Sequence, residues 1–224
     1  MTSFWAFMLL CFAGNEIQGL TGKVRFELLL FDPVSKDFTT PVLPPSELWV
    51  HNQYVIEVNR IYKQTMVGDQ VEKDSYPVQG YFFIDIDKNI CAEYDQLSVN
   101  GQKKKSYPLG EKKNGYRFHN AEDLFKNTLS KIKISDSVIN NTFYKKFTLI
   151  TDGPSTMITA YLDTTITTLP LYMSKTIRDK YKGHIARMDI EDLALYAKMS
   201  YRMSFEKMAL PDSVAAVIQK WALY

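Results

Sequence analysis

The stretch GYFFIDIDKNICAEY, residues 80–94, decides the fold expected for this chain. Along its first arm Phe82, Ile84 and Ile86 occupy every second position, and a period of two residues is that of a β-strand with unlike faces. The tripeptide DKN at 87–89 supplies residues typical of turns, and the alternation then resumes on a return arm. The pattern predicts a β-hairpin with one apolar face.

The composition is that of a globular protein. Of the 224 residues, 46% are hydrophobic and 23% are charged, so the chain can bury a substantial core, and disorder of the whole chain is excluded. Aromatic residues reach 13%, which favours β-structure or a ligand-lined cavity. The formal net charge is +2, which is too small to imply nucleic acid as a partner.

The N-terminus carries an apolar run, FWAFMLLCFA at 4–13, with the length of a signal-peptide core and too short to span a bilayer. Small and polar residues follow at 14–19, but no Lys or Arg precedes the run. We therefore expect residues 1–19 to be a signal peptide or, alternatively, a buried N-terminal segment, and residues 20–224 to be a single α+β domain. If the run is a signal, the protein is exported to the periplasm or cell surface.

The two cysteines, Cys11 and Cys91, do not predict a disulfide framework. Removal of the apolar run would leave Cys91 alone, and one thiol cannot form an internal disulfide. The sequence favours a half-buried structural thiol at Cys91 over a nucleophile.

Alternation of apolar and polar residues predicts further strands. They lie at 22–31, 48–50, 54–61, 143–150, 156–162, 184–190 and 199–206. Two Asn-Gly dipeptides, at 100–101 and 114–115, are expected to form type I′ turns that reverse strands, because Asn-Gly accommodates the positive φ angles of that turn.

Helical spacing predicts three short helices. The first covers 120–132, the second 174–182, with Ser174 as its cap and Gly183 as its stop, and the third 211–223. The fold class expected is α+β: a predominantly antiparallel, strongly curved β-sheet, or half-barrel, with a few short helices packed on it, including one at the C-terminus.

Few residues are placed for catalysis. The histidines, His51, His119 and His184, are far apart, and none has a metal-ligand partner three to five residues away. No catalytic or phosphate-binding motif is present. The sequence predicts no catalytic residue, no metal and no cofactor, and favours a protein that is not an enzyme.

The alternating oxygens of Asp85, Asp87 and Asn89 resemble the start of a calcium loop. However, Ile90 stands where that loop needs Gly, and Gln96 where it needs a bidentate Glu, so a strand running into a turn is the better explanation.

Two further patterns have ordinary readings. The lysines at 103–105 and 112–113 are interpreted as protection of an exposed sheet edge rather than as an anion-binding patch. The tripeptide NNT at 140–142 is a glycosylation sequon, which has meaning only in a eukaryotic secretory pathway.

Large side chains occupy the positions expected to face inward. The candidate ligand-binding residues on the concave face are Phe26, Tyr54, Ile56, Phe82, Ile84, Tyr201, Met203 and Phe205. A bent sheet lined in this way either fills itself as a core or leaves an apolar cavity, and both readings stay open. Methionine among aromatic residues suits an adaptable pocket wall.

Several strings occur in a recognisable order: GKV at 22–24, VHNQYVIEVN at 50–59, YFFIDIDKN at 81–89, and late strands before a terminal element. This order resembles that of exported bacterial proteins of the LolA-like and GLPGLI-type groups. The resemblance spans residues 22–147; the GLPGLI signature itself is absent, LPL at 169–171 being the nearest string. It implies a periplasmic or surface β-protein with a concave apolar face that handles an acyl chain, and it assigns no site residue.

Three functions remain as hypotheses. The first is a non-enzymatic cell-envelope protein whose concave apolar face binds an acyl or lipid-like molecule or an envelope protein partner. The second is a secreted structural or interaction protein with a solid core and with its function on exposed loops such as residues 40–46. The third is a hydrolase with a dispersed site.

Overall fold

The structure is a computed structural model that describes residues 19–67, 70–116, 123, 125–151, 156–192 and 197–223, with the backbone alone over 65–67 and 70–74. The apolar run at 4–13 lies outside the described residues, so the prediction of a signal peptide or buried segment stays a prediction. Among the described residues, no helix combines the length and apolarity needed to cross a membrane.

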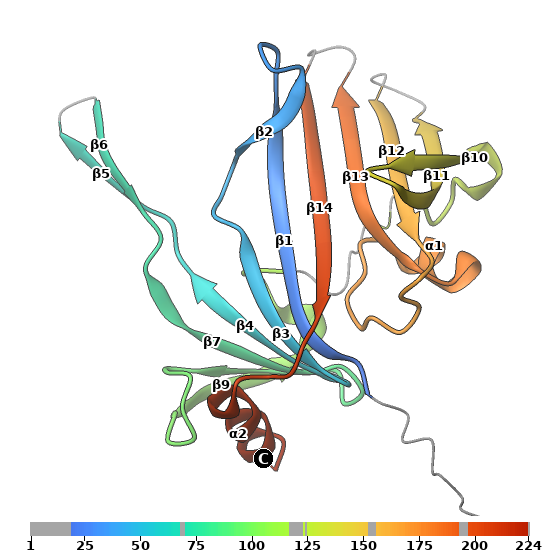
Figure 1. Cartoon of the computed structure of the whole chain (residues 1–224). Coiled ribbons are helices and arrows are strands. Elements are labelled where there is room, and N and C mark those ends of the chain that lie inside the picture. The colour runs from blue at the N-terminus through green and yellow to red at the C-terminus, as the bar shows by residue number, and fades with distance from the viewer. Residues whose placement is uncertain are drawn as a thin grey trace, which may run out of the picture.

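The described chain is mostly antiparallel strand (Figure 1). The strands are β1 (Thr21–Asp32), β2 (Asp37–Pro41), β3 (Ser46–His51), β4 (Tyr54–Arg60), β5 (Lys63–Val67), β6 (Gln70–Ser75), β7 (Val78–Asp85), β8 (Ile90–Tyr94), β9 (Lys103–Pro108), β10 (Lys133–Ile139), β11 (Thr142–Ile150), β12 (Thr156–Asp163), β13 (His184–Asp192) and β14 (Ala197–Lys207). The helices are α1 (Lys175–Tyr181) and α2 (Asp212–Trp221), with short 3₁₀ turns η1 (Leu109–Glu111) and η2 (Leu129–Lys131). The predicted fold class is confirmed.

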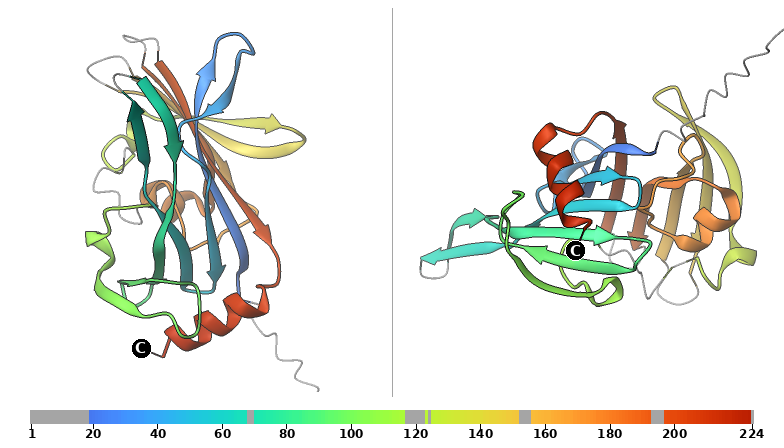
Figure 2. Two further views of the ribbon diagram at one scale, coloured as in Figure 1. Left: turned by 90° about the vertical axis from the view of Figure 1, so that its left-hand side faces the viewer. Right: turned by 90° about the horizontal axis from the view of Figure 1, so that it is seen from below.

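One open sheet of 12 strands dominates the molecule, in the order β10-β11-β12-β13-β14-β1-β3-β4-β7-β8-β9, with β2 paired to β1. Strands β5 and β6 form a separate ribbon that projects from the ends of β4 and β7 (Figure 1). The sheet bends sharply: β13, β14 and β1 stand as a wall, while β4, β7 and β8 turn beneath them as a floor (Figures 1 and 2).

Asparagines in the left-handed conformation shape three of the tight hairpins. Asn52 (φ 55°) turns β3 into β4, Asn89 (φ 57°) turns β7 into β8, and Asn140 and Asn141 (φ 50° and 62°) turn β10 into β11. The last pair has the two positive φ angles of a type I′ turn, with Ile139 opposite Thr142. The sequon residues thus form a hairpin turn, which the sequence reading missed.

The two Asn-Gly predictions are wrong in their details. Strands β8 and β9 do reverse at Asn100-Gly101, but within a longer loop at 95–102 rather than through a two-residue turn. Asn114-Gly115 follows η1 and does not connect two strands in the part of the chain that is described.

The helix predictions have mixed outcomes. α1 begins as expected, since the Ser174 side chain accepts a hydrogen bond from the Ile177 N–H, and the C-terminal helix α2 is confirmed. Lys182 (φ 52°), not Gly183, adopts the left-handed conformation that ends α1. The helix predicted at 120–132 is wrong over its described part, which holds turns and η2.

The sequence predicted a hairpin with one apolar face, and this prediction is wrong. Both faces of the floor are buried. Phe82 is 1% exposed and contributes to the main core on the concave side, whereas Phe83, 6% exposed, belongs to a second core on the outer side. Helix α2 covers that outer face, where Trp221 stacks on Tyr94 with ring centroids 3.8 Å apart. Alternation therefore identifies the strands but does not show that α2 covers their second face.

Candidate functional site

Six of the eight candidate ligand-binding residues lie on the concave side, and two do not. Phe82, Ile84 and Met203 are fully buried in the main core, and Phe26, Tyr201 and Phe205 are partly buried against it. The prediction is wrong for Tyr54 and Ile56. Both belong to the second core, beneath α2.

The register of β4 explains this error. Val55 pairs with Ile84 and Glu57 with Phe82, so these residues share the concave face and their neighbours on β4 point the other way. Tyr54 accordingly stacks on Phe83, with ring centroids 5.5 Å apart. We expected Tyr54 and Ile56 of β4 to face the concave side. In the structure the Glu57 carboxylate faces that side instead.

That carboxylate is neutralised by a buried ion pair. Lys112 Nζ lies 2.7 Å from Glu57 Oε2, and both side chains are 1% exposed. The same ammonium donates hydrogen bonds to the carbonyl oxygens of Asn114 (2.6 Å) and Tyr116 (2.7 Å), and the Tyr116 N–H donates to Glu57 Oε1 (2.6 Å). The chain from η1 to Tyr116 is thereby fastened onto the concave side of the floor.

A glycine allows this close approach. Gly115 has φ +69°, and a Cβ placed there would lie 2.2 Å from Glu57 Oε1. Burial raises the pKa of Glu57, and the charge and hydrogen bond of Lys112 counteract part of that rise. Lys112 also lies over the Phe82 ring, 4.4 Å from its centroid. This buried ion pair and its hydrogen bonds therefore attach the loop at 112–116 to the floor of the sheet.

The floor also buries the thiol of Cys91. It is 0% exposed, and burial raises the pKa of its thiol to about 11. A thiol with that pKa is almost entirely protonated at neutral pH and is a poor nucleophile. This environment supports the structural role predicted for Cys91, but the side chain is fully buried and not half-buried as predicted.

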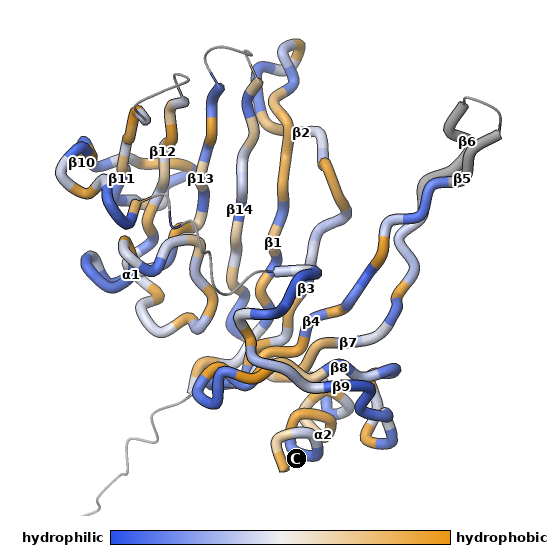
Figure 3. The backbone as a smooth tube through the Cα atoms, turned by 180° about the vertical axis from the view of Figure 1, so that it is seen from behind, coloured by the Kyte–Doolittle hydropathy of each residue, from blue (hydrophilic) through white to orange (hydrophobic). Residues whose placement is uncertain are grey.

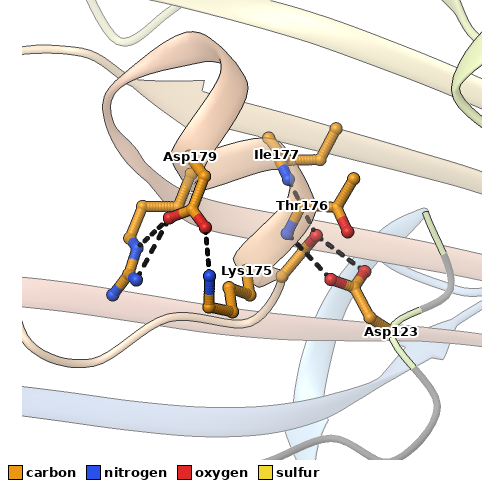
Figure 4. A network of polar contacts seen from close by, with 7 residues as sticks. Asp123, Lys175, Thr176, Ile177 and Asp179 are labelled. Carbon is orange, nitrogen blue, oxygen red and sulfur yellow. Dashed lines mark hydrogen bonds and ion pairs between the residues drawn. The ribbon is translucent and has the colours of Figure 1, made fainter. Parts of the chain in front are cut away.

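A second carboxylate ties the neighbouring segment to α1 (Figure 4). Asp123 accepts hydrogen bonds from the Ser174 hydroxyl (2.8 Å) and from the Thr176 N–H (2.9 Å), and also from the Phe125 N–H (3.1 Å). Burial acts to raise the pKa of Asp123, but these hydrogen bonds outweigh it, and the pKa lies below its ordinary value. The contacts hold Phe125, 0% exposed, in the main core.

The wall, in contrast, keeps part of its concave face uncovered. Successive inward residues of β1 change from buried Val24 (0% exposed) through partly buried Phe26 and Leu28 to exposed Leu30 (42%). The upper half of β1 is strongly hydrophobic in Figure 3.

Neighbouring strands extend this surface. Leu28 pairs with Tyr201 and Leu30 with Met199, while Met199 in turn pairs with Ile190 on β13. Directly paired residues share a face of the sheet. We name this surface the upper face; it consists of Phe26, Leu28, Leu30, Ile190, Met199 and Tyr201, all partly or well exposed. The alternation that selected Phe26 and Tyr201 also contained Leu28, Leu30 and Met199, which were not chosen as candidates, and Ile190 lies on the predicted strand at 184–190.

Residues 43–46, within the loop predicted at 40–46, line a separate hollow of about 250 Å³, although Thr40 and Pro41 belong to β2 and Ser46 to β3. Strands β3 and β4 pair only from Leu48 and Glu57 to the turn, so they separate beyond that point. Pro44 and Pro45 line the hollow together with Arg60, Tyr62 and Tyr76.

No catalytic constellation is found among the described residues. His51 Nδ1 lies 3.0 Å from the Thr21 hydroxyl, and His184 is buried on β13, where burial lowers its pKa. His119 lies outside the described residues. Asp85 Oδ1 accepts the Lys88 N–H, as expected for a turn, and the described residues contain no group of three His, Cys, Asp or Glu side chains that could hold a metal ion.

Comparisons with known proteins add little. No protein-family model matches the chain, and no curated protein matches it. Among solved structures it is similar to PNGF-II, with 11% identity and a TM-score of 0.38, over 88% of this chain and 30% of PNGF-II. The chain thus corresponds to less than a third of the length of PNGF-II, and a likeness this distant transfers no function. The LolA-like and GLPGLI-type resemblance stays a prediction.

Proposed function

We propose that this protein is a non-enzymatic binding protein whose upper face takes the apolar chain of a lipid-like ligand. The observation that carries the proposal is the change in burial along one face of β1, from 0% exposed at Val24 to 42% at Leu30. An apolar surface that continues from a packed core onto partly exposed positions of three adjacent strands is typical of a binding surface.

The chemistry of the upper face suits an alkyl chain. Its six residues offer aliphatic, thioether and aromatic surface, and Met199 can adapt its unbranched side chain to the ligand. Burial of apolar surface contributes about 25 cal/mol per Å², so a chain that covered a few of these residues would gain useful affinity. In this proposal the protein acts in the cell envelope, as the apolar run at 4–13 predicts.

Titration with cis-parinaric acid, a fluorescent fatty acid, tests this function. We expect saturable fluorescence enhancement with the wild-type protein. Leu30→Asp should weaken binding about tenfold or more, because it places a carboxylate in the apolar contact and 1.4 kcal/mol already corresponds to a factor of ten.

Ile150→Asp is the matched control. Ile150 is 59% exposed and lies on β11 of the same sheet, but it alternates with Leu149 of the main core and so faces outward. The control should bind like the wild type. Absence of uptake by the wild type, or equal losses in the two variants, would overturn the proposal and return attention to the hollow beside residues 40–46.

A further inference from the structure

The two ends of the open sheet carry very different strands. At one end β9 presents Lys103, Lys104 and Lys105, all exposed, which confirms the edge position predicted for these three lysines. The same prediction is wrong for Lys112, which is buried in its ion pair with Glu57. Charged residues, lysine above all, discourage another strand from adding to an edge. The other end, β10, has no such row.

Strand β10 and its partner expose apolar side chains on one face. Ile134, Val138 and Phe143 are 41%, 56% and 77% exposed, and Val138 pairs directly with Phe143. Strand β12 pairs with β11 only from Lys145 onward, so the end of the β10–β11 hairpin projects beyond its neighbour (Figure 2). No strand in the described part of the chain pairs with the outer edge of β10.

The Asp136 carboxylate on β10 indicates which residues of a partner strand would pair favourably with this edge. Asp136 lies between Ile134 and Val138 on the same face, with its side chain 88% exposed. On the inner side, β11 meets this apolar–acidic–apolar pattern with Phe147, Lys145 and Phe143, with Lys145 Nζ 3.9 Å from Asp136 Oδ1. Strand β11 therefore shows the side-chain pattern that is complementary to β10.

We propose that the outer edge of β10 binds an extended segment of another protein in which a basic residue is flanked, two positions away on each side, by apolar residues. Backbone hydrogen bonds to the free edge would hold the segment, and the alternate side chains would select it. The basic residue would lie opposite Asp136, and its apolar neighbours opposite Ile134 and Val138.

A second copy of this chain fits less well. The longest antiparallel pairing of two β10 strands, over all seven residues, places Asp136 directly opposite Asp136 of the other copy. Like charges directly opposite one another destabilise a strand pair. The edge therefore favours a partner of opposite charge over self-association.

A fluorescein-labelled peptide with the β11 sequence TFYKKFTLI, residues 142–150, is the probe, with fluorescence anisotropy as the readout. We expect saturable binding to the wild-type protein, weakened about five- to tenfold by Asp136→Lys. A peptide with Glu at the position of Lys145 should lose affinity for the wild type and regain it with Asp136→Lys. Such a reciprocal exchange reports pairing across the edge and cannot result from a general loss of folding.

Asp87→Lys makes the same charge change at an exposed turn and should leave peptide binding unchanged. Asp136→Asn, which preserves the size of the side chain, provides a milder variant if the reversal perturbs the hairpin. The proposal is overturned if no peptide binds, if the exchanged pair fails to restore binding, or if the protein occupies its β10 edge by dimerising, as light scattering would show.

Discussion

The floor and the wall of this sheet have the same two-residue period but differ in how far their inward residues are exposed to solvent. On the floor, inward residues such as Phe82 and Ile84 are buried, and Glu57 holds the loop that carries Lys112 over Phe82. On the wall, the inward face of β1 emerges from the core and ends at Leu30, 42% exposed. The difference teaches that alternation determines which side chains share a face, whereas a distant segment decides whether that face becomes core or binding surface.

Breaking the ion pair between Lys112 and Glu57 should cause the largest loss of stability. Lys112→Ala would leave the Glu57 carboxylate buried without its cation, and we expect a loss of about 3–5 kcal/mol in the free energy of unfolding, measured by urea denaturation. The double variant Glu57→Leu/Lys112→Met removes both charges and should lose less than the single variant. A loss below about 1 kcal/mol for Lys112→Ala, the range of a solvent-exposed pair, would mean that the floor is not sealed.

Truncation of one inward residue in each region sharpens the contrast directly. Ile84→Ala creates a cavity at a position 0% exposed and should cost about 2–5 kcal/mol. Leu30→Ala, at a position 42% exposed, should change stability by about 0.5 kcal/mol. Equal costs, again by urea denaturation, would show that the two regions are covered to the same degree.

Acid should loosen the cover of the main core to a smaller extent. The pKa of Asp123 is lowered in the folded state, so its stabilising contribution is present above the unfolded value of about 3.9 and is lost as the pH falls towards the folded value. At pH 7 Asp123→Asn should cost about 1–2 kcal/mol, because hydrogen bonds to a charged acceptor are replaced by weaker ones to a neutral amide oxygen, and the difference from the wild type should shrink below about pH 4.

Asp179→Asn serves as the control for this measurement. Asp179 lies on α1 and pairs with Lys175 and Arg178, but it is exposed, so its removal should cost less. A pH-independent difference between Asp123→Asn and the wild type would contradict the role given to the Asp123 carboxylate.

Much of the fold was predictable because its signals are local. The alternation around Phe82 and Met203 located β7 and β14, and Ser174 marked the start of α1. The inward orientation of Glu57 was not predictable, since the cation that neutralises it comes from a distant loop and no local pattern reveals the pair. The turn at 140–141 is a different case, because Asn-Asn between two strand-like runs was a local signal that the sequon reading overlooked.

The candidate site was predicted in part. Phe26 and Tyr201 belong to the upper face, but Tyr54 lies on the opposite side of the sheet, because a face that holds one charged residue was taken for the outer one. The exposure of a side chain depends on which segments cover its strand. The periodicity of one strand does not show that α2 or the loop with Lys112 covers it.

Methyl NMR of the protein titrated with palmitate distinguishes binding at the upper face from binding elsewhere on the sheet. We expect methyl signals of Leu28, Leu30, Ile190 and Met199 to shift in a saturable manner, while those of Ile84 on the floor and Ile218 of α2 stay unchanged. Perturbation centred on Ile84 or Ile218, or no perturbation of the upper face at all, would contradict it.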